Sequence, residues 1–261
     1  MKKCLSARSR ITRMALVAVV IAVAFQTSSS ANHSWNGYHW ARQSNPFTIN
    51  LGDNLSAAWK SYLSQTSGDW STSAVLDTSV VAGKSKNKRC SATSGRVEVC
   101  NGTYGQNGWL GVAQIWLASG TKHITQGTVK VNDTYFSMPR YNNKSEREHV
   151  LCQEVGHTLG LDHQDESGTS LNTCMDYYFN TSDTDANSTS PNPHDYEELV
   201  AVYSHTDSTT TIGSTAATLP DAVPSWAPAS QLAPSIYVDA LPNGDTLVTY
   251  VFWANPIHSR F

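Results

Sequence analysis

The feature that most constrains this chain is a short run in its second half that joins a helix pattern to metal-ligating side chains. Successive residues of a helix turn by about 100°, so Gln153, Glu154 and His157 fall on one side of it. Gly160 can adopt the left-handed conformation that ends a helix, which turns the chain and brings His163 back toward His157. Side chains of these types, gathered at one place, can hold a metal ion.

The helix that carries this run has recognisable boundaries. Ser145 and Glu148 match a capping box, in which Ser145 is the N-cap residue and Glu148 reaches back to its amide. The pattern predicts a helix from about Glu146 to about Leu159. Val155 and Leu159 lie on the side opposite the metal-ligating residues, and we expect that side to pack into the core.

Zinc is the metal that this set of donor atoms favours. A catalytic zinc site needs three protein ligands and an open position for water, and Gln153, His157 and His163 supply three. Glu154 stands where it could take a proton from that water. The amide oxygen of Gln153 is a weaker zinc donor than imidazole, so we expect zinc to be held less tightly. His149 lies about 12 Å from His157 along the helix, which is too far to share the metal.

A methionine-containing segment follows the helix. Thr173 to Tyr177 includes Met175 and stands a short distance after His163. Together with the helix motif, this segment makes the chain resemble the metzincin clan of zinc metalloproteases, and the residues from His157 to His163 are matrixin-like. The chain departs from the clan at Gln153, where the first histidine ligand is expected.

The resemblance implies a role for each of these residues. The zinc ligands would be Gln153, His157 and His163. Glu154 would be the general base and acid, and Met175 would form the turn beneath the zinc. Tyr177 matches a tyrosine that in astacin-like members helps to stabilise the oxyanion, so Glu154 and Tyr177 are the expected catalytic pair.

The resemblance also implies an α+β fold. We expect a metzincin-like catalytic domain with a twisted five-stranded mixed sheet, an active-site helix, a Met-turn and a C-terminal helix. Alternating or β-branched residues predict strands at 47–51, 74–81, 96–100, 110–117 and 124–132. A helix containing Trp59 and Leu63 follows the first strand. Asn192 followed by Pro193 predicts the start of the closing helix, which ends near His205.

One predicted strand bears directly on substrate binding. By the resemblance, Val112 to Leu117 would be the edge strand above the cleft. An edge strand has unpaired amides that can add an extended peptide by β-augmentation. The alternative is an edge that merely faces solvent.

The predicted organisation has five parts. Residues 1–31 form a secretory signal peptide, with cleavage after Ala31. Its apolar run is short for a membrane span, which needs about 20 residues, although an uncleaved anchor remains an alternative. Beyond it we expect a short N-terminal segment (32–45), the catalytic domain (46–205), a linker rich in Ser, Thr, Ala and Pro (206–234), and a C-terminal β-hairpin tail (235–261).

The cysteines agree with a secreted, extracellular protein. Of five cysteines, Cys4 leaves with the signal peptide, and four remain in an oxidising compartment. Cys90 and Cys100 flank a short segment, and a bridge between Cys152 and Cys174 would pin the Met-turn to the active-site helix. We therefore predict these two disulfides, with buried free thiols or other pairings as the alternatives.

The net charge and the remaining histidines limit the classes of partner that we expect. A net charge of −3 with 15% charged residues excludes a nucleic-acid-binding surface as the main theme. Nothing local marks His39, His123 or His194 as a ligand. We expect a protein or peptide substrate, Zn²⁺ as cofactor, no nucleic acid, no stable membrane span after signal cleavage, and a monomer.

Two functions from different classes follow. The first is a secreted zinc-dependent endopeptidase, in which Glu154 activates a zinc-bound water. The second is a catalytically impaired, metzincin-like module that binds extended peptides or surface ligands, because Gln153 weakens the metal site. A pure binder has no need of a general base, so the presence of Glu154 favours the enzyme.

Overall fold

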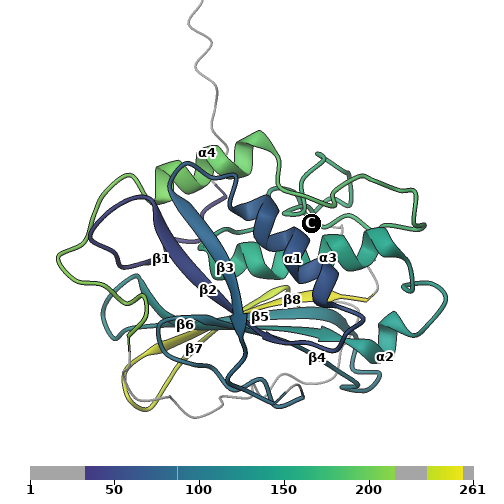
Figure 1. Ribbon diagram of the computed structural model, residues 1–261, viewed down its shortest axis with the longest axis horizontal. Coiled ribbons are helices and arrows are strands. Elements are labelled where there is room, and N and C mark those ends of the chain that lie inside the picture. Colours follow the sequence, from purple (N-terminus) through teal and green to yellow (C-terminus); the bar gives the residue numbers. More distant parts are fainter. Residues whose placement is uncertain (1–32, 87, 215–233, 255–261) are drawn as a thin grey trace, which may run out of the picture. The chain divides into compact units, whose positions relative to one another are not determined.

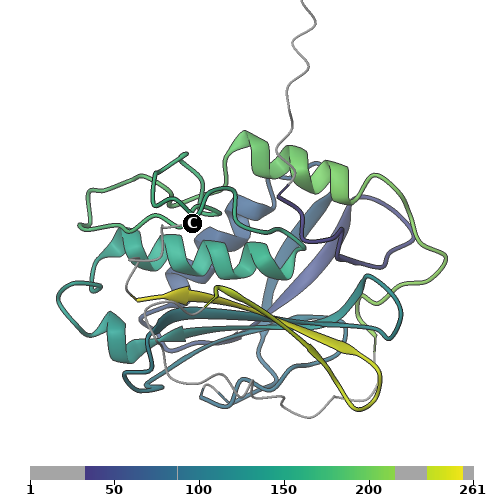
Figure 2. The same cartoon turned by 180° about the vertical axis from the view of Figure 1, so that it is seen from behind.

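The fold is built on one mixed sheet that carries its main helices on one face (Figures 1 and 2). The computed structural model describes residues 33–86, 88–214 and 234–254. The strands are β1 (His39–Trp40), β2 (Phe47–Asn54), β3 (Leu76–Ala82), β4 (Val97–Gly102), β5 (Trp109–Leu117), β6 (His123–Asn132), β7 (Ile236–Ala240) and β8 (Thr246–Trp253). The helices are α1 (Lys60–Trp70), α2 (Asp133–Phe136), α3 (Lys144–Thr158) and α4 (Pro193–Val202).

The sheet has the strand order β3-β2-β4-β6-β5-β8-β7, with β1 paired to β6. Strands β1, β2, β3, β4 and β6 run parallel to their partners in this group. Strand β5 is antiparallel to β6, and the hairpin β7–β8 continues the antiparallel part by pairing β8 with β5. The α+β class is therefore as expected, but the sheet has eight strands rather than five.

The prediction that Val112 to Leu117 forms an edge is wrong. These residues lie in β5, which has β6 on one side and β8 on the other. The pairing with β8 runs from Trp109 opposite Trp253 to Leu117 opposite Thr246. An exposed row of backbone amides and carbonyls readily pairs with another strand, and here the tail of the same chain supplies it.

Helix α3 begins earlier than its capping box predicts. Its N-cap is Asn143, whose side chain accepts a hydrogen bond from the amide of Glu146 at 2.8 Å. Asparagine is as good an N-cap residue as serine, and Ser145 therefore lies inside the first turn. Glu148 forms an ion pair with Lys144 at 3.0 Å instead of reaching back to Ser145.

The closing helix α4 follows its sequence signal. Asn192 caps the helix and Pro193 occupies the first turn. The Asn192 side chain accepts from the amide of Asp195 at 3.2 Å, and the Asp195 carboxylate accepts from the amide of Asn192 at 2.7 Å. This reciprocal capping box fixes the point at which the chain enters the helix.

Residues after α4 join the fold more closely than a linker would. The amide of Asp207 donates to the Arg42 carbonyl at 2.8 Å, and the amide of Thr211 donates to the Ala41 carbonyl at 3.0 Å. Residues 206–214 are thus part of the folded unit, although the sequence assigns them to the linker. The rest of that linker and the predicted signal peptide lie outside the described residues.

Both predicted disulfides are present. Cys90 is bonded to Cys100, and Cys152 is bonded to Cys174. The second bond ties α3 to the segment that contains the buried Met175. Within the residues that the structure describes, no helix combines the length and the apolar character needed to cross a bilayer.

Candidate metal centre

Two of the predicted ligands, His157 and His163, face each other. Their Nε2 atoms are 3.1 Å apart. The Nδ1 atom of His157 is 2.9 Å from the Leu161 carbonyl, and Nδ1 of His163 is 2.7 Å from the Glu166 carboxylate. Such contacts fix the ring and direct Nε2 outward, which is the usual support of a metal-binding histidine. The pair can therefore serve as two ligands of one ion.

Gly160 makes this approach of the two histidines possible. It has a φ of +99°, in the region that glycine alone adopts without strain. A Cβ atom at this position would also lie 2.2 Å from the Tyr38 carbonyl oxygen. The turn after α3 therefore requires glycine, as the sequence pattern predicts.

Glu154 is buried one helical turn before His157 on α3, and the amides of Ala113 and Phe252 lie near its carboxylate. Among the described residues, neither of its carboxylate oxygens has a hydrogen-bond partner. Burial raises the pKa of Glu154 well above its usual value, and the nearby amides of Ala113 and Phe252 oppose this only in part. A buried carboxylate without partners is costly, and it is the kind of group that binds a proton or contacts a bound ion.

Gln153 offers one donor atom to the site. Its amide nitrogen donates to the Asp176 carbonyl at 2.6 Å. Its Oε1 atom is buried and has no hydrogen-bond partner among the described residues. This oxygen remains available as a ligand, whereas the ring nitrogens of His149 face Asn180 and the Asp176 carbonyl at 2.9 and 3.0 Å. The two histidines offer two imidazole donors, and Gln153, one helical turn before His157, offers a weaker amide oxygen.

Tyr177 lies next to His163 but its hydroxyl is engaged elsewhere. The two rings are 5.1 Å apart, edge to face. The Tyr177 hydroxyl donates to the Val251 carbonyl at 2.9 Å and accepts from the Trp253 amide at 2.7 Å. Both partners belong to β8, so the described position of Tyr177 depends on that strand.

Strand β8 covers the whole centre. The ring of Tyr250 stacks on His157 at 4.1 Å with an interplanar angle of 8°. The ring of Phe252 stacks on Tyr177 at 4.8 Å and meets the edge of His149 at 5.3 Å. As a result the two candidate ligands and Glu154 are buried.

Sequence analysis did not assign a role to this strand. Its residues Leu247 to Trp253 are all buried, which leaves no solvent-facing side. A strand that is apolar on both faces is typical of a position inside a sheet. That signal was available in the sequence, but it does not say which strand is the partner.

Two further groups of side chains could hold a metal ion. The first consists of His33, His194 and Glu198, and the second consists of His39, His205 and Asp207. Neither group contains a residue that the metal-site motif predicts. His39 and His194 each belong to a separate cluster that brings together distant parts of the chain.

Comparisons with known proteins give a distant likeness among solved structures. No family model matches the chain, and no curated protein matches it. Among solved structures, the chain is similar to one described as the structure of myroilysin. That match has 13% sequence identity and a TM-score of 0.34, and it covers 63% of this chain and 96% of the other. Values this low do not transfer an activity.

Proposed function

We propose that this chain is a secreted zinc-dependent endopeptidase. The observation that carries the proposal is the approach of His157 and His163 through their Nε2 atoms, 3.1 Å apart, with the buried Glu154 one helical turn before His157 on α3. Two imidazoles and an amide oxygen match a three-ligand zinc site, with Gln153 as the third donor. The two disulfides support secretion.

Glu154 is the residue that would move the proton. Zinc, when bound, would polarise a water molecule and the peptide carbonyl. Glu154 would accept a proton from the attacking water and deliver it to the leaving amine nitrogen. Burial raises the pKa of Glu154, and a base with a raised pKa holds the abstracted proton long enough to return it. Tyr177 would donate a hydrogen bond to the developing oxyanion after its hydroxyl leaves the Val251 carbonyl.

Access to this site requires the tail to move. An extended peptide that pairs with β5 would use the same backbone groups that now bond to β8. The peptide would also need the space that the rings of Tyr250 and Phe252 fill. We therefore propose that the described arrangement is a closed, latent form, and that hydrolysis follows displacement of the hairpin.

The enclosure also favours a second function. A metzincin-like module without hydrolytic activity could use β5 to bind an extended segment, with β8 as the segment from its own chain. In that case the presence of Gln153 at the first ligand position would leave a centre that no longer hydrolyses peptides. The two functions differ in whether Glu154 participates in chemistry.

Hydrolysis of peptides decides between the two functions. The purified mature chain, supplied with zinc, is incubated with casein and with a library of quenched fluorescent peptides, beside Glu154→Gln. A second pair carries Phe252→Ala, which weakens the covering strand. Cleavage that is stopped by EDTA and lost in Glu154→Gln supports the enzyme. If neither the zinc-loaded wild type nor zinc-loaded Phe252→Ala cleaves any substrate, and amide exchange shows that β8 opens, the binding module is supported.

A further inference from the structure

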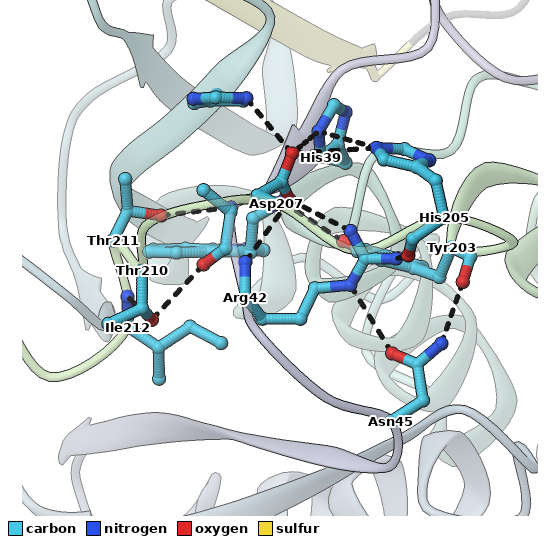
Figure 3. A network of polar contacts seen from close by, with 12 residues as sticks. His39, Arg42, Asn45, Tyr203, His205, Asp207, Thr210, Thr211 and Ile212 are labelled. Atoms are coloured by element: carbon cyan, nitrogen blue, oxygen red, sulfur yellow. Dashed lines mark hydrogen bonds and ion pairs between the residues drawn. The ribbon is translucent and has the colours of Figure 1, made fainter.

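Three histidine side chains converge on one carboxylate oxygen, away from the centre described above. The Oδ1 atom of Asp207 lies 3.5 Å from Nε2 of His39, 3.3 Å from Nε2 of His123 and 3.6 Å from Nε2 of His205 (Figure 3). The Nε2 atoms of His39 and His205 are 3.2 Å apart. Three histidines and one aspartate therefore form a single cluster.

The fold builds this cluster from three separate segments. His39 lies in β1 and His123 begins β6, and these two residues are direct partners in the parallel pairing of the strands. Asp207 belongs to the segment after α4, where its amide bonds to the Arg42 carbonyl at 2.8 Å. Backbone pairing thus brings the segments that carry His39, His123 and Asp207 to one place.

The hydrogen bonds around the cluster leave ligand atoms pointing inward. Nδ1 of His39 is 2.7 Å from the Gly37 carbonyl, so it carries the hydrogen and leaves the lone pair on Nε2. The lone pair then faces a carboxylate oxygen at 3.5 Å, and two acceptors in that position attract a cation between them.

Arg42 holds the other oxygen of the carboxylate. Its guanidinium Nη1 donates to Asp207 Oδ2 at 3.0 Å, and its amide donates to the same atom at 3.2 Å. These bonds orient the carboxylate and direct Oδ1 toward the histidines. Support of this kind, outside the ligands themselves, is typical of transition-metal sites.

The distances match those between ligands of one ion. Zinc lies about 2.0–2.1 Å from its nitrogen and oxygen ligands, so two ligands of a tetrahedral site stand roughly 3.3–3.4 Å apart. The three separations among His39, His205 and Asp207 are 3.2, 3.5 and 3.6 Å. Imidazole with carboxylate suits zinc and similar transition metals rather than calcium or magnesium, which prefer oxygen alone.

We propose that His39, His205 and Asp207 bind a transition-metal ion of the zinc type at a second site, with His123 beside them as a further donor. The side chain of His205 is 48% exposed, which gives the ion an entry path. An ion at this point would link the N-terminal segment, β6 and the segment after α4. The site is separate from the pair His157 and His163 and does not depend on hydrolytic activity.

The test counts bound metal and needs no activity. The mature chain is freed of metal with EDTA and titrated with cobalt(II), whose visible absorption reports tetrahedral coordination, and bound cobalt and zinc are measured by mass spectrometry. His205→Gln should bind one equivalent fewer than the wild type and lose the corresponding absorption. His123→Gln should weaken the same equivalent about 10–100-fold, as expected for a neighbouring donor. His194→Gln, a change in the other histidine group, is the matched control and should keep the His205-dependent equivalent.

The same comparison separates this site from the candidate catalytic centre. In a His157→Gln background the His205-dependent equivalent should remain, whatever the outcome of the hydrolysis assay. If His205→Gln, folded by circular dichroism, binds as much cobalt and zinc as the wild type in both backgrounds, the proposal is wrong. The cluster would then be a hydrogen-bonded network around Asp207. His205 is the deciding position because its half-exposed side chain can change without disturbing the core.

Discussion

Replacing Phe252 by alanine should release hydrolytic activity that the C-terminal hairpin holds back. Phe252 is 1% exposed, and its ring stacks on Tyr177 at 4.8 Å and meets His149 at 5.3 Å. Truncation of a buried phenylalanine costs about 3–5 kcal/mol. If that cost falls on docking of the hairpin, the undocked population rises roughly 160- to 4,700-fold, because each 1.36 kcal/mol is a factor of ten.

The rate of peptide cleavage should rise with that population until the open form predominates. The assay measures initial rates with zinc-loaded wild type and Phe252→Ala, and amide hydrogen exchange reports opening of β8 in the same samples. Leu76→Ala is the matched control. Leu76 is equally buried but lies in β3, at the opposite end of the strand order from the hairpin. It should lower global stability by a similar amount without raising the rate.

One result would refute the reasoning. If β8 amides exchange rapidly in Phe252→Ala while the cleavage rate stays at or below that of the wild type, the hairpin does not limit access. An equal rise of the cleavage rate in Leu76→Ala would also contradict the reasoning, because a general loss of stability would then explain the higher rate.

Further changes test other parts of the structure. Glu154→Gln should lower cleavage at least 100-fold, the scale of general base catalysis, while zinc binding measured by dialysis is retained. Gln153→His should tighten zinc at least 10-fold in a chelator competition, because imidazole replaces a weaker amide donor. Breaking the Cys152–Cys174 bond by a double change to serine should lower the free energy of unfolding in urea by about 2–4 kcal/mol. Burial raises the pKa of Glu146 well above its usual value, so the folded state keeps this proton to higher pH than the unfolded chain does. Stability should therefore fall as pH rises above about 4.3, the unfolded value, and urea midpoints of Glu146→Gln should fall less over the same range.

The sequence pattern predicted those parts of the site whose geometry depends only on residues close together in the chain. The spacing of Glu154, His157 and Gly160 is enough to place them on a helix and its terminal turn, because helical contacts span only a few residues. The capping of α4 by Asn192 is local for the same reason. The N-cap of α3 was misplaced by two residues because Asn143 and Ser145 are both good caps, and sequence alone does not rank them.

Contacts between distant segments could not be predicted in this way. The alternation in the tail indicates a hairpin, but pairing of Gln114 with Thr249 joins residues that lie far apart in the chain. Likewise, no sequence pattern near His39 predicts its contact with His205 and Asp207. The cluster forms only after α4 has returned the chain to β1. Each of these contacts depends on the complete sheet.

The energetic cost of Glu154 argues for chemistry at the enclosed centre. A module that only filled its groove with its own hairpin would be more stable with an apolar or amide side chain at this position, since a buried carboxylate without a hydrogen bond costs free energy. The rings of Tyr250 and Phe252 stack on His157 and Tyr177 in the same enclosed centre. Local strain of this kind is characteristic of functional sites. Burial raises the pKa of Glu154 in the closed form, and hydration when β8 leaves would lower it again and free the carboxylate to act as a general base.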